Sequence, residues 1–266
     1  MLQGRRPHIR HLRLFGHRIR TAVWPGRADR PPLLLLNGIG ANLELLAPVA
    51  DSLADLEVIA FDAPGVGGSG PALHPYRPWQ YALLATRVLD ALGYRGKVDV
   101  LGVSWGGAMA QQLAFQARGR VRRLVLAATA AGVLMVPGHP RAFLKLASPR
   151  RYLDPDYLER CFETLYGDEA IDGGHAARIR SPSVPGYLFQ LFAGTGWTSA
   201  PFLPLIPHET LVLAGRRDPI VPAINGRILA SLIRRARLQI VDGGHLFLVS
   251  KAPQVMPIID DFLAES

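Results

Sequence analysis

A serine between two glycines, at the junction of a predicted strand and a predicted helix, constrains this chain most. Gly102-Val103-Ser104-Trp105-Gly106 follows the apolar, β-branched residues 97–101 and precedes the helix-forming residues 107–115. A G-x-S-x-G sequence in this context is typical of a nucleophile elbow, a sharp turn in which the serine occupies strained backbone. The two glycines avoid collisions where the strand and the helix cross. We therefore predict a serine nucleophile in preference to an ordinary glycine-rich turn.

A serine hydroxyl is a weak nucleophile at neutral pH, so the chain must also supply a histidine base and an orienting carboxylate. Asp218 follows a predicted buried strand at residues 210–213, and His245 follows the last predicted strand, at residues 237–241. The order serine, acid, histidine is the order found in hydrolases with this elbow. Asp242 is a rival acid, but it is awkwardly placed on the same loop as His245. The predicted catalytic residues are Ser104, Asp218 and His245.

A short loop with two glycines follows the all-leucine run 33–36. In hydrolases with this elbow, a loop after the corresponding strand supplies one backbone N–H group to the oxyanion hole, and the residue after the serine supplies another. By position, the two donors are the N–H groups of Ile39 and Trp105. The alternative is an ordinary strand-to-helix turn. Asn42 is expected to cap a helix that runs to about Leu53.

The predicted elements alternate in a way that indicates the fold class. Residues 8–24 are expected to form an antiparallel hairpin around Gly16-His17. Further on, buried strands alternate with helices, which predicts an α/β fold with a mostly parallel central sheet and helices on both faces. The glycine-rich residues 62–70 lack the spacing of a dinucleotide fingerprint. We interpret Asp62 as a structural residue that accepts hydrogen bonds from loop N–H groups.

Residues 133–207 interrupt the alternation of strands and helices. They are rich in proline and glycine, and they are expected to form a mainly helical cap inserted over the site. The core is then divided into residues 1–132 and residues 208–266. We expect some aromatic side chains of the cap to line an apolar acyl pocket and others to form its own core. These aromatic residues are Phe143, Tyr152, Tyr157, Phe162, Tyr166, Tyr187, Phe189, Phe192, Trp197 and Phe202.

The net charge of +9 comes mostly from arginine. A basic surface can bind nucleic acid, but these arginines are scattered, without a long run or an RNA-binding motif. We interpret them as solvated surface charge and predict no nucleic-acid partner.

The basic residues 1–14 lack the apolar run of a signal peptide, and the longest apolar runs of the chain are too short to cross a bilayer. These features predict a cytoplasmic protein without a transmembrane segment. With Cys161 as its single cysteine, the sequence excludes an internal disulfide and a cysteine-based zinc site. No histidine and carboxylate cluster has metal-ligand spacing, and the predicted chemistry requires neither a metal nor an organic cofactor.

The chain resembles the intracellular poly(3-hydroxyalkanoate) depolymerases for medium-chain polyesters, a branch of the α/β-hydrolases. The resemblance covers nearly the whole chain and implies an α/β-hydrolase fold with the triad at Ser104, Asp218 and His245. It also implies hydrolysis of a stored polyester at a granule surface. Arg216 and Arg217 depart from the pattern, because acidic residues are expected there. The segments that carry the resemblance are 20–26, 36–44, 58–62, 64–69, 102–107, 124–132, 147–152, 190–199 and 244–248.

The predicted function is therefore ester hydrolysis of poly(3-hydroxyalkanoate) to 3-hydroxy acids, through an acyl-enzyme. A general carboxylesterase or lipase with the same triad is the nearest alternative. A C–C bond hydrolase is a further one, and a granule-binding protein on a hydrolase scaffold is the non-enzymatic one. The sequence leaves the oligomeric state, the chain-length preference and the choice between internal and terminal cleavage open.

Overall fold

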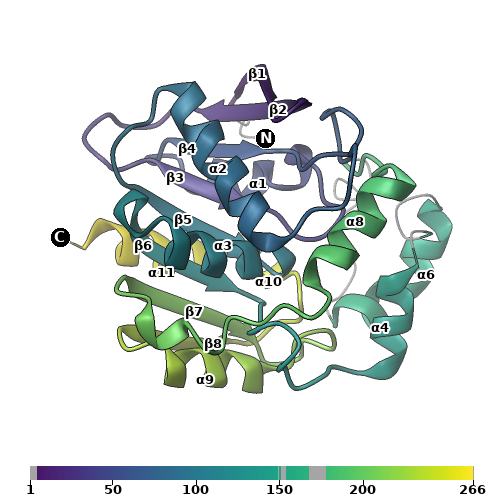
Figure 1. Ribbon diagram of the computed structural model, residues 1–266. Coiled ribbons are helices and arrows are strands. Elements are labelled where there is room, and N and C mark those ends of the chain that lie inside the picture. Colours follow the sequence, from purple (N-terminus) through teal and green to yellow (C-terminus); the bar gives the residue numbers. More distant parts are fainter. Residues whose placement is uncertain (1–4, 149, 151–153, 168–177, 266) are drawn as a thin grey trace.

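An eight-stranded sheet forms the centre of the part of the chain that is described (Figure 1). The computed structural model describes residues 5–148, 150, 154–167 and 178–265. The strands lie in the order β1-β2-β4-β3-β5-β6-β7-β8. Their bounds are His8–Leu14 (β1), His17–Trp24 (β2), Leu33–Leu36 (β3), Val58–Phe61 (β4), Val98–Val103 (β5), Val121–Ala127 (β6), Glu209–Gly215 (β7) and Ala236–Val241 (β8).

The sheet is mostly parallel, as the alternating elements predict. Strands β3 to β8 pair in parallel, whereas β1 and β2 form an antiparallel hairpin and β2 pairs antiparallel with β4. The hairpin turns at Gly16, which has a φ of +79°. The predicted hairpin and the predicted buried strands are therefore confirmed, with boundaries that differ by at most a few residues.

The leucines of β3 illustrate why the central strands are apolar on both sides. All four are buried. Leu34 and Leu36 pack into the core on one face of the sheet, and Leu33 and Leu35 pack into the core on the other face. Burying each leucine contributes about 1.5–3 kcal/mol before the cost in conformational entropy.

Helices cover both faces of the sheet, as expected. In Figure 1, α2 and α3 lie in front of the strands, and α10 and α11 lie behind them. The front core includes Val88 of α2 and Leu113 of α3, and the rear core includes Phe247 and Ile259. The helix bounds are Ala47–Ser52 (α1), Pro78–Leu92 (α2), Trp105–Gln116 (α3), Ala223–Leu232 (α9), Phe247–Ser250 (α10) and Ala252–Ala264 (α11).

Among the described residues between β6 and β7, three α-helices lie at one end of the sheet, on the right of Figure 1. They are α4 (Pro140–Ala147), α6 (Pro155–Tyr166) and α8 (Val184–Gly194), and each has a proline in its first turn. The side chain of Asp154 caps α6, and that of Ser183 caps α8. Tyr152, one of the aromatic residues noted above, lies outside the described residues.

The expected helix from Asn42 to about Leu53 is wrong in its form. A 3₁₀ turn spans Leu43–Leu45, and α1 begins only at Ala47. The Asn42 side chain makes no capping hydrogen bond. Its amide instead bonds to backbone groups of Arg178 and Arg180, far along the chain. A tertiary contact has therefore replaced the local one that the sequence suggests.

Candidate active site

Ser104 lies at the sharp turn between β5 and α3, with φ 54° and ψ −117°. This is strained backbone for a residue with a side chain, as predicted for a nucleophile elbow. The flanking glycines are required sterically. A Cβ atom on Gly102 would lie 2.5 Å from the Gly106 carbonyl oxygen, and one on Gly106 would lie 2.2 Å from the Leu36 carbonyl oxygen. The predicted role of both glycines is confirmed.

The structure brings together the three side chains that the sequence predicts. The Ser104 Oγ lies 3.0 Å from His245 Nε2, and His245 Nδ1 lies 2.7 Å from Asp218 Oδ2. The second oxygen of Asp218 accepts the backbone N–H groups of Ile220 and Val221, at 2.9 and 2.8 Å. Asp218 and His245 are only 5% and 6% exposed. Asp218 is thus fixed on one side while its other oxygen holds the imidazole.

The rival acid Asp242 has a different partner. Its carboxylate pairs with Arg217 at 2.6 Å, and these two side chains are 68% and 52% exposed. Arg217, one of the two arginines that depart from the family pattern, is therefore turned to the surface beside Asp242. This pairing leaves Asp218 as the carboxylate that contacts His245.

The imidazole of His245 is also supported from the segment between β6 and β7. The backbone N–H of His245 donates to the carbonyl of Tyr166 at 2.6 Å. The two rings stack with their centroids 6.4 Å apart and their planes at 15°. Tyr166 at the end of α6 thus fixes both the backbone and the ring face of His245.

The two expected oxyanion donors lie beside Ser104. Trp105 is the first residue of α3, where a backbone N–H has no partner within the helix and the helix dipole favours negative charge. Ile39 lines the same two cavities as Ser104. The loop before it is shaped by Asn37, whose side chain accepts the Gly38 N–H at 2.9 Å and donates to the Asn42 carbonyl at 2.9 Å.

Two apolar cavities meet at Ser104. The larger has a volume of about 300 Å³, and its lining includes Phe143 and Trp197. The smaller has a volume of about 100 Å³, and its lining includes Tyr166 and His245. Tyr187, in contrast, is almost fully buried in a cluster with Ile39. The aromatic residues of the inserted segment therefore divide between cavity walls and packing, as expected.

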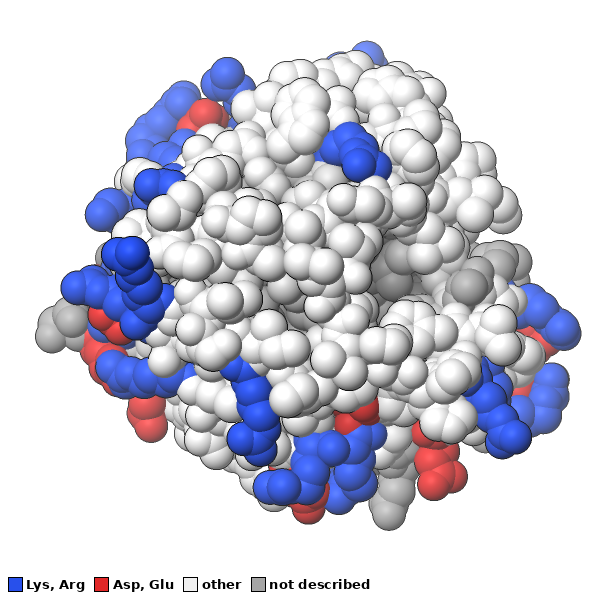
Figure 2. All heavy atoms as spheres, turned by 60° about the horizontal axis from the view of Figure 1, so that its bottom comes forward, with Lys and Arg blue, Asp and Glu red and all other residues white. Residues whose placement is uncertain are grey.

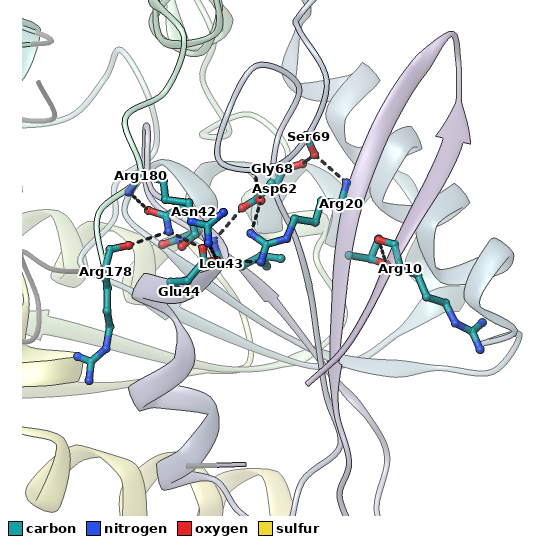
Figure 3. A network of polar contacts seen from close by, with 12 residues as sticks. Arg10, Arg20, Asn42, Leu43, Glu44, Asp62, Gly68, Ser69, Arg178 and Arg180 are labelled. Atoms are coloured by element: carbon teal, nitrogen blue, oxygen red, sulfur yellow. Dashed lines mark hydrogen bonds and ion pairs between the residues drawn. The ribbon is translucent and has the colours of Figure 1, made fainter. Parts of the chain in front are cut away.

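A polar network joins residues 42–44 to the loop after β4 (Figure 3). Asp62 accepts the N–H groups of Leu43 and Gly68, both at 2.8 Å, which confirms its predicted structural role. Arg20 bridges Asp62 at 3.3 Å and Glu44 at 2.8 Å. Burial raises the pKa of Asp62, although the hydrogen bonds from Gly68 and Leu43 oppose this shift.

In the same network, Asn42 connects the core to the segment after α6 (Figure 3). Its Nδ2 donates to the Arg178 carbonyl at 2.9 Å, and its Oδ1 accepts the Arg180 N–H at 3.0 Å. Ile179, between those two residues, lines the smaller cavity. Asn42 therefore fixes one wall of the site through two backbone hydrogen bonds.

Like Asn42, Gln190 of α8 makes contacts near the site that the sequence did not indicate. Its Oε1 accepts the Gly40 N–H at 2.7 Å, and its backbone carbonyl accepts the Trp105 indole N–H at 2.9 Å. Gln190 thus contacts a neighbour of Ile39 and the side chain of Trp105. Asn42 and Gln190 both lie in segments that carry the family resemblance, but no local pattern indicates these contacts, because the partners lie more than 80 residues away.

Among the described residues, no group of three or more histidine, cysteine, aspartate or glutamate residues is arranged to hold a metal ion. None of the described helices is both long and apolar enough to span a bilayer.

Comparisons with known proteins find similar hydrolases. The family described as alpha/beta hydrolase fold matches residues 31–252. A poly(3-hydroxyalkanoate) depolymerase from Ectopseudomonas oleovorans is 52% identical over 97% of this chain and 94% of its own length. A 2-hydroxymuconate semialdehyde hydrolase from Pseudomonas sp. strain CF600 is 33% identical over 88% of this chain and 87% of its own.

A solved structure is also similar over nearly its whole length. The crystal structure of a hydrolase from Pseudomonas aeruginosa PA01 has a TM-score of 0.81 and 26% identity, and the match covers 97% of this chain and 99% of that one. The family match and the 52% identical relative together cover most of the chain. The chain belongs to the alpha/beta hydrolase fold family.

Proposed function

We propose that this protein is a serine hydrolase that cleaves the ester bonds of poly(3-hydroxyalkanoate) and releases 3-hydroxy acids. The observation that carries the proposal is the hydrogen-bonded series Ser104–His245–Asp218, which opens into an apolar cavity of about 300 Å³. The 52% identity to a poly(3-hydroxyalkanoate) depolymerase over nearly the whole chain supports the polyester as substrate.

In the proposed acylation step, His245 Nε2 accepts the Ser104 proton while Oγ attacks the ester carbonyl carbon. Asp218 keeps the Nδ1–H tautomer of the imidazole and stabilises the imidazolium that forms. The backbone N–H groups of Ile39 and Trp105 bind the developing oxyanion. The imidazolium then protonates the alcohol end of the polymer, which leaves as a hydroxyl group.

Hydrolysis of the acyl-enzyme repeats these roles with water as the nucleophile. His245 takes a proton from the water molecule, the oxyanion is bound by the same N–H groups, and Ser104 leaves with the proton.

The smaller cavity includes His245 in its lining, whereas the larger one does not. Since His245 protonates the leaving alcohol, we assign the smaller cavity to the alcohol side and the larger one to the acyl side.

We further propose that residues 133–207 act as a cap on a core formed by residues 1–132 and 208–266. Phe143, Leu146 and Trp197 from this segment line the larger cavity together with Ser104. Tyr166, from the same segment, contacts His245. A substrate must therefore pass between the inserted segment and the strand ends to reach the serine.

The outer surface of this segment supports contact with a solid hydrophobic polymer, such as a storage granule. Most of the exposed large hydrophobic side chains among the described residues lie between positions 133 and 207. Val184, Leu188 and Phe192 follow one another at intervals of four residues on α8, so they share one outward face. Leu144 on α4 is 75% exposed.

A small-molecule esterase is the second candidate. The same triad serves either kind of ester. A C–C bond hydrolase would share the triad as well, and a granule-binding protein without activity would retain only the apolar outer surface.

Rates on two kinds of substrate separate these candidates. We expect the purified full-length chain to degrade dispersed amorphous medium-chain polyester and to release 3-hydroxy acids. Turnover of a short p-nitrophenyl ester without release from the polymer would favour the small-molecule esterase. Failure of a fluorophosphonate probe to label Ser104 would contradict every version of the serine hydrolase.

A further inference from the structure

The side chain of Gln190 is oriented by one hydrogen bond. It is 2% exposed and lines the larger cavity at Ser104. Its Oε1 accepts the Gly40 N–H at 2.7 Å. Since an N–H can only donate, the amide oxygen faces the loop and the amide nitrogen points away from Gly40.

This nitrogen is the donor that the cavity leaves unused. Among the described residues, Gln190 Nε2 has no hydrogen-bond partner, and it is not one of the fully enclosed unpaired atoms. The other donor side chains in the lining are engaged within the protein. The Thr129 hydroxyl donates to the Ser104 carbonyl at 2.7 Å, and the indoles of Trp105 and Trp197 donate to Gln190 and Gln112, each at 2.9 Å.

We propose that Gln190 Nε2 donates a hydrogen bond to the oxygen on carbon 3 of the acyl group, so that Gln190 selects 3-oxygenated acyl chains over plain fatty acyl chains. This inference rests on the proposed function. A 3-hydroxyalkanoate unit is apolar beyond its ester carbonyl except for this one oxygen. The cavity matches that pattern, because its described lining is mostly apolar and carries no charged side chain.

The position of Gln190 suits this contact. Gly40, which orients the amide, is adjacent to Ile39, one of the proposed oxyanion donors. The amide is thereby held near the place where the reacting carbonyl binds, and the oxygen on carbon 3 is only two carbons from that carbonyl carbon. A plain acyl chain would fill the cavity but leave Nε2 without an acceptor, and such an unpaired buried donor is what permits discrimination.

The oxygen on carbon 3 has two sources, which the substrates of the test distinguish. At a polymer end it is a free hydroxyl, and inside the polymer it is the alkoxy oxygen of the next ester. Ethyl 3-hydroxyoctanoate represents the first and ethyl 3-methoxyoctanoate the second, and ethyl octanoate lacks the oxygen. The readout is the ratio of kcat/KM for each oxygenated ester to kcat/KM for ethyl octanoate.

Two substitutions test the donor. Gln190→Met removes both amide atoms, and Gln190→Glu, assayed at about pH 8 where a carboxylate is ionised, keeps the acceptor for Gly40 but loses the donor. In either variant the ratio should fall by about fivefold to tenfold, the value of one hydrogen bond. Gln254→Glu makes the same exchange at an exposed position on α11 and should keep the wild-type ratio.

The ratio separates selection from positioning. Loss of the Gly40 contact alone would lower the rates on all three esters together and leave the ratio unchanged, which would overturn the proposal. A fall for the hydroxy ester alone would assign the contact to the polymer end, and a fall for both would extend it to internal units. If the wild type releases no acid from the polymer, the proposed polyester function fails, whatever the ratio shows for Gln190.

Discussion

At the scale of single residues, two aspartates near His245 have different environments. Asp218 accepts two backbone N–H groups with one oxygen and contacts the imidazole with the other. Asp242 lies at the surface against Arg217. The sequence favoured Asp218 by chain order and by its place on a separate loop after a strand, whereas Asp242 shares the loop of His245. The geometry adds the physical reason, because Asp218 is held by the loop that follows it and Asp242 faces solvent.

We therefore expect Asp218→Asn to reduce kcat by about 10⁴-fold, because an asparagine favours the wrong imidazole tautomer. Asp242→Asn is the matched control and should stay within about threefold of wild type, since exposed ion pairs contribute little. Steady-state rates on a soluble ester measure both. Equal losses in the two variants would contradict the assignment of Asp218 as the orienting acid.

The glycines of the elbow allow a test of folding. A Cβ on Gly106 would lie 2.2 Å from the backbone carbonyl oxygen of Leu36, so backbone must shift to admit it. We expect Gly106→Ala to destabilise the fold by about 3 kcal/mol or more, as overpacking against backbone does. Gly119→Ala adds the same methyl group where nothing lies within 4 Å and should change stability by about 1 kcal/mol or less. Urea denaturation compares the two, and equal stabilities would contradict the steric argument.

Sequence reasoning found some site residues and missed others for a physical reason. Ser104, Asp218 and His245 each follow a strand, so local pattern and chain order sufficed to name them. Gln190 and Asn42 act on the site through partners 150 and 136 residues away. No local pattern encodes such contacts, because they exist only once the inserted segment packs on the core.

At the scale of elements, the same distinction explains the one element that was wrongly predicted. Strands such as β3 were predictable because burial on both faces requires a continuous apolar run. In place of the helix expected from Asn42 there is a 3₁₀ turn followed by α1. The Asn42 side chain does not cap that turn; it forms hydrogen bonds with the backbone of Arg178 and Arg180. Local propensity yields here to a tertiary contact.

The ionisation of Glu44 makes the hydrogen-bond network around Asn42 sensitive to acid. Burial opposes its ionisation, but hydrogen bonds from Arg20 and Asn42 outweigh burial and lower the pKa of Glu44 from 4.5 to about 2. Because the folded pKa lies below the unfolded one, the stabilisation is complete above about pH 4.5 and is lost as the pH falls towards 2.

We expect Glu44→Gln to remove part of the acid dependence of stability in that window. Across that pH range, the variant should lose about 1 kcal/mol less unfolding free energy than the wild type, since solvent screens a partly exposed group. Unfolding free energies of wild type and variant, measured by denaturation across this pH range, give the result. Curves that run parallel from neutral pH into acid would show that Glu44 does not contribute in this way.

At the scale of the whole molecule, charge and apolar surface are separated. Figure 2 shows charged side chains mostly towards the left, lower and right margins of the face in view, with few of them on its broad, mostly uncharged central part. The net charge of +9 is thus dispersed, as the sequence analysis expected. Exposed apolar side chains gather instead on the segment between β6 and β7, notably Val184 and Leu188 of α8.

If this segment contacts the polymer, Leu188→Glu should weaken adsorption of the protein to polyester particles by about fivefold, because a partly exposed leucine contributes about 1 kcal/mol on burial. Polymer hydrolysis should then fall more than hydrolysis of a soluble ester. Ile9→Glu, on the exposed edge strand β1, is the matched control. Sedimentation of particles with bound protein measures adsorption, and equal binding by the two variants would contradict a specific contact through α8.

The most direct test of the account is the release of soluble 3-hydroxy acids from amorphous medium-chain polyester by wild type and by Ser104→Ala. We expect release by the wild type and a loss of about 10⁴-fold or more in the variant, with the fold intact by circular dichroism. Release that persists in Ser104→Ala would contradict the nucleophile. No release by wild type, with esterase activity that still depends on Ser104, would preserve the mechanism and contradict the polyester as substrate.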